Sequence, residues 1–159
     1  MLVSPAHLLT AKPILHLMPK KLPKASPSSL LKDAIVEGML NKKGFDVTVL
    51  DLRQVHNAIT DYFILCSGNS DTQVDAITDS VEEEVYKALS QNPWHREGKQ
   101  NKEWILLDYA DCVVHVFKKD RREFYGLENL WGDAIFTYYN EFGKPSSEPI
   151  KQQVLVNQL

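Results

Sequence analysis

The segment Trp104–Phe117, with the sequence WILLDYADCVVHVF, constrains the fold of this chain more than any other. Two apolar stretches flank the short polar sequence Asp108-Tyr109-Ala110-Asp111. This pattern is typical of two antiparallel strands joined by a tight turn. We therefore predict a β-hairpin with acidic groups at its tip.

Side chains alternate along a strand, which divides the first strand of this hairpin into two faces. Trp104, Leu106 and Asp108 share one face, while the two residues between them and Tyr109 share the other. One face can join a hydrophobic core, and the other can present a tryptophan with a carboxylate beside it. Two interpretations stay open on this basis: Trp104 completes the core, or Trp104 anchors a binding partner.

Apolar residues spaced three and four positions apart predict helices on both sides of this hairpin. The first helix is expected over residues 28–43, with its N-cap supplied by Ser28-Ser29. The second begins after Ser70, where Gln73 completes a capping box, and is broken near Pro93. A capped helix between two strand-like segments favours an α/β fold.

A third helix is predicted from a capping pattern formed by Asp120 and Glu123, with Phe124 and Trp131 on its apolar face. Outside the hairpin, strands are expected at residues 45–52, 61–67 and 94–97. The resulting order is α-β-β-α-β-β-β-α. We therefore predict an α/β fold in which helices pack on a mixed sheet of about five strands.

The composition along the chain predicts one folded domain between two tails. Residues 1–27 contain five prolines, four lysines and no acidic residue, so we expect a disordered basic tail. Residues 28–142 form the predicted domain, and residues 143–159 a flexible C-terminal tail. We expect a cytoplasmic protein, with an organelle matrix as the alternative if the basic tail is a transit peptide.

Charge is distributed unevenly, which bears on the class of partner. Residues 44–117 hold thirteen acidic and five basic residues, a formal charge of −8. Such a segment is poorly suited to a phosphate backbone, where Lys and Arg supply the affinity. Two interpretations stay open: the acidic residues match a basic protein surface, or they only solvate helix faces. This charge predicts no sequence-specific nucleic acid as partner. No apolar run approaches the ~18 residues that span a bilayer, so we predict no membrane partner either.

Catalytic and metal-binding patterns are weak throughout the chain. The five histidines show no H-x-x-H spacing and have no cysteine pair to complete a zinc site. His115, between two valines of a predicted strand, is interpreted as a hydrogen-bonded structural imidazole. Cys66 and Cys112 lie in apolar runs and are interpreted as buried thiols, although a pairing of Cys66 with His115 is conceivable. We expect no metal and no cofactor.

The strongest enzyme-like pattern is Gly68-Asn69-Ser70, between a strand and a capped helix, because helix N-termini favour anions. Nucleotidyl transfer also needs clustered carboxylates to hold two metal ions. On one strand these would follow D-x-D spacing, whereas Asp108 and Asp111 are three apart across a predicted turn. We therefore predict a nucleotidyltransferase-like architecture without the catalytic carboxylates, and no enzymatic activity.

Several blocks, in this order, resemble the Iojap-type ribosomal silencing factor family. The resemblance extends from Leu30 to Ala134, nearly the whole predicted domain. The ordered set is much more specific than any single block. The blocks are Asp51-Leu52-Arg53, Thr60–Gly68, Ser70 with Gln73–Ile77, Glu97-Gly98, the Trp104–Phe117 hairpin, and Phe124–Trp131.

The resemblance implies a factor that binds the large ribosomal subunit through ribosomal protein L-fourteen. It would thereby block association with the small subunit and repress translation, and late large-subunit maturation is a second implied role. A homodimer of the free protein is compatible with the resemblance. The family's partner-contacting segment matches the hairpin, which gives the predicted site residues Trp104, Leu106, Asp108, Tyr109 and Asp111.

Overall fold

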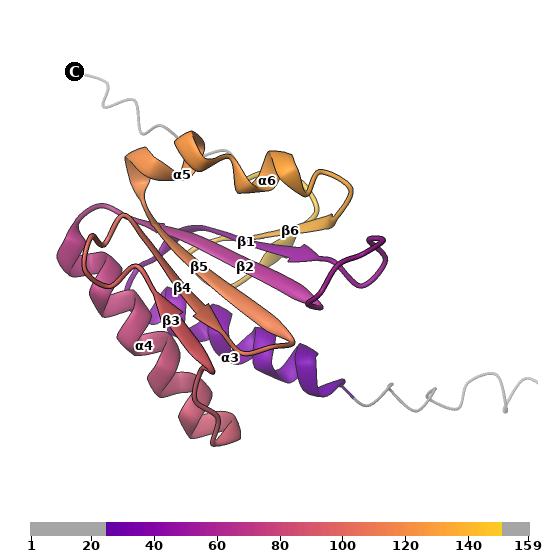
Figure 1. Cartoon of the computed structure of the whole chain (residues 1–159), viewed down its shortest axis with the longest axis horizontal. Helices are drawn as coiled ribbons and strands as arrows, with labels where there is room; N and C mark the ends of the chain where they lie inside the picture. The colour runs from indigo at the N-terminus through magenta and orange to yellow at the C-terminus, as the bar shows by residue number, and fades with distance from the viewer. Residues whose placement is uncertain (1–24, 151–159) are drawn as a thin grey trace, which may run out of the picture.

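In the computed structural model residues 25–150 are described, and they form a seven-stranded mixed sheet with two long helices on one face (Figure 1). The strand order is β3-β4-β5-β2-β1-β6-β7. The elements are α3 (Pro27–Asn41), β1 (Phe45–Asp51), β2 (Tyr62–Gly68), α4 (Asp71–Leu89), β3 (His95–Glu97), β4 (Trp104–Asp108), β5 (Cys112–Lys118), α5 (Lys119–Tyr125), α6 (Leu127–Leu130), β6 (Ile135–Tyr139) and β7 (Pro145–Ser146).

The predicted hairpin is confirmed as β4 and β5, which pair antiparallel with Trp104 opposite Phe117 and Asp108 opposite Val113. Strand β5 also pairs with β2, and this is the only parallel pair in the described sheet. A parallel pair needs a crossover connection, which α4 provides together with β3 and β4. The hairpin strand β4 therefore lies near one edge of the sheet, with only β3 beyond it.

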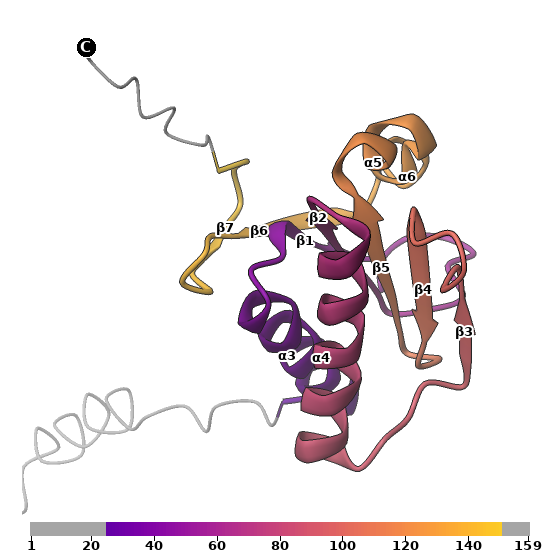
Figure 2. The same cartoon turned by 90° about the vertical axis from the view of Figure 1, so that its left-hand side faces the viewer.

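Helices α3 and α4 lie side by side on one face of the sheet (Figure 2). Gly38 of α3 permits this close approach, because a Cβ atom there would lie 2.6 Å from the Cα atom of Val81 in α4. The core beneath them is mainly aliphatic and fully buried, with Ile35, Val81 and Ile105 all at 0% exposure. Burial of apolar surface at this interface is the main stabilising contribution to the fold.

The opposite face of the sheet is covered by less structure. The short helices α5 and α6 lie over part of it, and a second cluster packs beneath them around Leu50, Leu65 and Phe117. Arg122 of α5 fixes this cover, because its guanidinium donates to the backbone carbonyl of Asp46 at 2.7 Å and to the hydroxyl of Thr48 at 3.1 Å. Part of this face, over β4 and β3, lies beyond these two helices.

The C-terminal part of the domain differs from the sequence prediction. The prediction of a single third helix is wrong, because Gly126 adopts a left-handed conformation with φ of 59° and separates α5 from α6. The capping pattern of Asp120 and Glu123 is also wrong, since α5 begins after Lys118 without a side-chain cap. The sheet has two strands more than predicted, β6 and β7, and β7 extends it past residue 142.

The helix starts were predicted with mixed success. Ser70 caps α4 as expected, since its hydroxyl oxygen accepts from the backbone N–H of Gln73 at 3.1 Å. At α3 the N-cap is Ser26, whose hydroxyl accepts from the N–H of Ser29, so the assignment to Ser28-Ser29 is wrong. Pro27 takes the first helical position, where its missing N–H carries no cost. Most of the predicted N-terminal tail, residues 1–24, lies outside the described residues.

Candidate partner-binding surface

Strand β4 separates a buried face from an accessible one, as the alternation of its residues predicts. Ile105 and Leu107 are 0% exposed beneath α3 and α4, in the aliphatic core. Trp104, Leu106 and Asp108 point to the opposite face and are all partly exposed. We call these three residues the β4 surface.

Trp104 belongs both to a packed cluster and to the β4 surface, so the two interpretations left open by the sequence are not exclusive. Its indole stacks on Phe117 with ring centroids 5.1 Å apart and contacts Tyr125 of α5 at 4.8 Å. Its Nε1–H donates to Nδ1 of His115 at 3.0 Å. The ring is held in place on one side while the side chain stays partly accessible.

His115 is a buried, hydrogen-bonded imidazole, as the sequence predicts. It is 3% exposed, and Phe63 contacts its ring edge-on with centroids 4.8 Å apart. Burial away from water lowers the pKa of His115 to about 3, because the charged imidazolium is disfavoured there. The ring is therefore neutral near pH 7, which leaves Nδ1 free to accept the hydrogen bond from Trp104.

The turn after β4 places two carboxylates at the end of the β4 surface. Asp108 accepts a hydrogen bond from the N–H of Ala110 at 2.8 Å, and the side chain of Asp111 is exposed. The backbone carbonyl of Asp111 accepts from the N–H of Asp61 at 3.0 Å, which ties the turn to the start of β2. The tip is therefore both acidic and fixed in position.

Tyr109, a predicted site residue, lies apart from the other four. It is 4% exposed and packs in the core on the helix-covered face. Burial raises the pKa of its hydroxyl above the ordinary range. The structure thus brings Trp104, Leu106, Asp108 and Asp111 to one accessible region, while Tyr109 supports the turn from beneath.

The sheet edge beside β4 extends this region with polar side chains that sequence reasoning did not assign. His95 and Glu97 of β3 pair opposite Asp108 and Leu106, so they share the accessible face. Their side chains are 2.7 Å apart and exposed. Strand pairing of β3 with β4 is the signal that places them there, and it depends on long-range register.

Groups of the Gly68-Asn69-Ser70 turn form hydrogen bonds to other groups of the protein. Gln73 accepts from the N–H of Asn69 at 2.7 Å, and its amide group donates to the carbonyl oxygens of Lys42 and Lys43. Together with the Ser70 cap, these bonds occupy backbone donors that a phosphate would use. Within residues 25–150 no group of three or more His, Cys, Asp or Glu side chains could hold a metal ion.

The two cysteines lie in the aliphatic core, as predicted, and both thiols are free. Burial raises the pKa of Cys66 and of Cys112 to about 12, so neither is a thiolate at neutral pH. Cys66 faces the helices, whereas His115 bonds Trp104 on the other side of the sheet. The conceivable pairing of Cys66 with His115 is therefore wrong.

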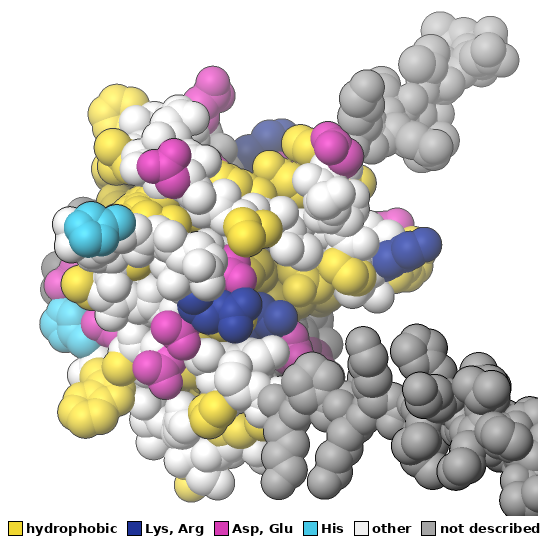
Figure 3. Space-filling view, turned by 90° about the vertical axis from the view of Figure 1, so that its right-hand side faces the viewer, with side chains coloured by type: hydrophobic (Ala, Val, Ile, Leu, Met, Phe, Trp, Pro, Cys, Tyr) yellow, Lys and Arg dark blue, Asp and Glu magenta, His cyan; other side chains and the backbone are white. Residues whose placement is uncertain are grey.

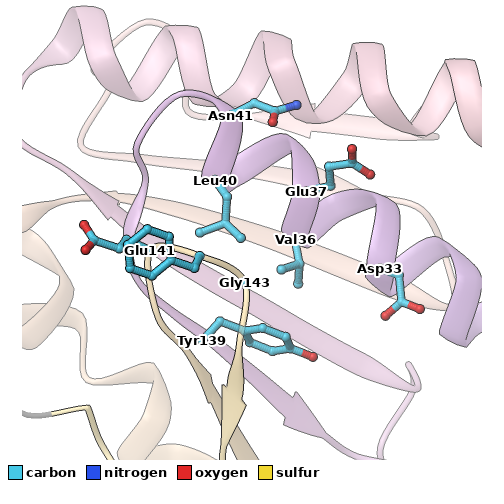
Figure 4. A pocket seen from close by; sticks show the side chains of 9 residues that line it. Asp33, Val36, Glu37, Leu40, Asn41, Tyr139, Glu141 and Gly143 are labelled. Carbon is cyan, nitrogen blue, oxygen red and sulfur yellow. The ribbon is translucent and has the colours of Figure 1, made fainter.

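A cavity of about 500 Å³ lies between α3 and the turn after β6 (Figure 4). Val36 and Leu40 form an apolar side, and Asp33, Glu37 and Glu141 supply carboxylates. Strands β5, β2 and β1 separate β6 from β4, so this cavity is distinct from the β4 surface.

On the face of the molecule that Figure 3 shows, Lys and Arg stand in small groups among hydrophobic and acidic side chains. This face of the described residues therefore lacks the basic stripe typical of nucleic-acid binding.

This geometry defines an α/β domain with an accessible strand face and with no cluster of metal-ligating side chains in residues 25–150. The family model described as "Ribosomal silencing factor during starvation" matches residues 24–155. The chain belongs to the ribosomal silencing factor family.

Relatives in this family come from bacteria and from organelles. The chain is 42% identical over 94 residues to ribosomal silencing factor RsfS of Bacillus subtilis, covering 59% of this chain and 78% of that protein. It is 36% identical to chloroplastic protein Iojap of Zea mays, covering 58% of this chain and 39% of the relative. It is 29% identical to mitochondrial assembly of ribosomal large subunit protein 1 of Mus musculus, covering 78% and 54% respectively.

The fold is also that of a solved structure at detectable sequence identity. A crystal structure of a protein from Chromobacterium violaceum is 31% identical and superposes with a TM-score of 0.60. The match covers 64% of this chain and 83% of the other. The α/β class with helices packed on a mixed sheet, predicted from the sequence, is therefore confirmed.

Proposed function

We propose that this protein binds the large ribosomal subunit through ribosomal protein L-fourteen, blocks association with the small subunit and so represses translation. Membership of the ribosomal silencing factor family supports the ribosomal part of this proposal. The observation that carries its specific part is the β4 surface, where Trp104 and Leu106 are accessible beside acidic groups. The protein acts by occupying a surface, and we propose no catalytic step.

The composition of the β4 surface suits a basic protein partner. A tryptophan and a leucine at the centre supply contact area, and aromatic anchors dominate the binding energy of many interfaces. Asp108 and Asp111 stand at one end of this surface and attract a basic partner during encounter. The indole of Trp104 is already held by Phe117 and His115, so little side-chain freedom is lost on binding.

Replacement of Trp104 tests this proposal. Trp104→Ala should weaken co-sedimentation with isolated large subunits by roughly 30-fold or more, since an anchor contributes ~2 kcal/mol or more. Tyr86→Ala is the matched control, because Tyr86 is 56% exposed on α4 and lies on the helix side of the sheet. Circular dichroism establishes that both variants are folded. A folded Trp104→Ala protein that still blocks subunit joining would exclude the β4 surface as the binding site.

Assembly of the large subunit is a second candidate function, favoured by the name of the mouse relative. A silencing factor inhibits joining of purified, mature subunits, whereas an assembly factor is required earlier and leaves joining unaffected.

We propose a cytoplasmic location for the protein, with an organelle matrix as the alternative that the chloroplastic relative suggests. None of the described helices is long and apolar enough to cross a membrane.

Nucleotidyl transfer is the least favoured alternative. We expect no saturable binding of ATP with Mg²⁺ at the Gly68-Asn69-Ser70 turn, because the Asn69 N–H already donates to the Gln73 side chain and the Gln73 N–H to the Ser70 hydroxyl. Isothermal calorimetry with the wild-type protein and Ser70→Ala tests this expectation. A micromolar site that disappears in Ser70→Ala would overturn the non-enzymatic proposal.

A further inference from the structure

His115 has a hydrogen-bonding arrangement that is unusual for a buried side chain. Its Nδ1 accepts from Trp104, so the single proton of the neutral ring lies on Nε2. That Nε2 atom is buried and has no hydrogen-bond partner among the described residues. An unpaired buried donor destabilises a folded protein, because its bonds to water are lost without replacement.

An apolar side chain of similar size would avoid this cost. Other neighbours of the His115 ring include Phe63 and Phe117, whose ring centroids lie 4.8 and 6.2 Å from its own. Hydrophobic packing alone would therefore be satisfied by leucine. What leucine could not supply is the acceptor for Trp104 Nε1–H, 3.0 Å away.

We propose that His115 is a positioning residue for partner binding: its Nδ1 atom fixes the orientation of the Trp104 indole within the β4 surface. The inference rests on the proposed function, because it assigns a role within the same surface. Stacking on Phe117 and contact with Tyr125 restrict the plane of the indole. A hydrogen bond is directional, so it also selects which edge of the ring faces the protein. The other edge of the indole then faces the partner in a single orientation, so little side-chain entropy is lost on binding.

Two substitutions of similar size separate packing from positioning. His115→Leu fills the space and removes both the acceptor and the unpaired donor. His115→Asn keeps an acceptor near the position of Nδ1 but adds buried amide hydrogens. We expect His115→Leu to melt close to the wild-type temperature, because it removes the unpaired Nε2–H but leaves the Trp104 Nε1–H without its acceptor. It should bind large subunits roughly 3- to 10-fold more weakly. We expect His115→Asn to melt lower and to bind within about 2-fold of wild type.

A double-mutant cycle tests whether His115 acts through Trp104. Trp104→Phe removes the indole N–H, so His115→Leu should weaken binding no further in that background. His115→Gln serves as a control for Asn, since its amide lies one methylene further out and misses the Nδ1 position. In the free protein, the indole ¹⁵N–H resonance of Trp104, assigned by its loss in Trp104→Phe, should move and exchange faster in His115→Leu than in His115→Asn.

The outcomes separate this inference from the proposed function. If Trp104→Phe and Trp104→Ala both bind large subunits normally, the proposed surface is wrong. If they bind weakly but His115→Leu binds like wild type although its indole resonance moves, the surface stands and the positioning role is overturned. Equal weakening by Leu, Asn and Gln, each with a lowered melting temperature, would show that His115 is structural only.

Discussion

The two faces of the central sheet differ in how fully they are covered. Towards α3 and α4 the sheet presents aliphatic residues such as Ile64, Leu107 and Val114, all 0% exposed. Towards the other side it presents leucines such as Leu50 together with aromatic rings and an imidazole, and Trp104 on this side is partly exposed. The first face is sealed by two long helices, and the second is only partly covered by short ones. Stability is therefore concentrated on one face and accessibility on the other.

Substitutions at two adjacent residues of β4 test most directly whether the two faces contribute differently to stability. Leu107→Ala should lower the free energy of unfolding by ~2–5 kcal/mol, because it leaves a cavity in a fully buried core. Leu106→Ala removes a partly exposed side chain from the accessible face, so the loss should be below ~1 kcal/mol. Urea denaturation followed by circular dichroism measures both values.

Binding should respond in the reverse order. Under conditions where both variants are folded, Leu107→Ala should bind large subunits like wild type, and Leu106→Ala should bind more weakly. Equal stability losses for the two variants would mean that β4 is buried on both faces. The assignment of function to one face would then lose its basis.

The pH dependence of stability tests how deeply His115 is buried on the second face of the sheet. Its pKa is lowered to about 3 by burial, whereas an unfolded histidine titrates near 6.5. The unfolded state therefore binds the extra proton first, so stability is complete above pH 6.5 and falls as the pH drops towards 3. At pH 5 this group should cost about 2 kcal/mol relative to pH 7.

The variant His115→Leu isolates that contribution from the carboxylates, which also titrate at low pH. Melting curves from pH 7 to pH 5 should be less steep in pH for His115→Leu than for wild type. Identical pH slopes for the two proteins would show that His115 is not desolvated to the degree that its 3% exposure implies.

The sequence predicted the local features of both faces better than their long-range partners. The β4 alternation, the Ser70 cap and the turn at residues 108–111 follow from neighbours in the chain, and all are present. The bond between Trp104 and His115 joins residues on two strands, so it depends on hairpin register. No local pattern contains that information.

Strand β6 was not predicted from the sequence, for a different reason. Its sequence, Ile-Phe-Thr-Tyr-Tyr, has the β-branched and aromatic composition of a strand, but apolar residues adjoin each other on both sides of Thr137. The alternation of apolar and polar residues that marks a half-buried strand is therefore absent. The third helix was predicted as continuous because helical spacing persists across Gly126, whose left-handed conformation separates α5 from α6.

The acidic turn offers a test of the accessible face that leaves its packing intact. Asp111→Asn removes an exposed charge, and Asp108→Asn removes a charge while its oxygen can still accept from Ala110 N–H. Each should slow association with large subunits by a few-fold, equivalent to about 0.5–1 kcal/mol, chiefly at low ionic strength. Stopped-flow or surface-based kinetics at two salt concentrations measures the effect. An unchanged association rate at low salt would show that the turn does not face a basic partner.

Substitution of Ala110 in the same turn should give an effect of similar size, but as a gain in stability and not as a loss of binding. Its φ of 70° lies in the left-handed region, which costs an alanine roughly 1–2 kcal/mol because of its Cβ atom. Ala110→Gly removes that strain but increases the freedom of the unfolded chain, which offsets roughly 0.5–1 kcal/mol of the gain. The net result should be about 0.5–1 kcal/mol of added stability, seen as a melting temperature a few degrees higher. Binding should be unchanged, because the N–H of residue 110 still donates to Asp108 and the carboxylates keep their places. A stabilised turn that binds less well would show that strain at Ala110 contributes to the shape of the accessible face.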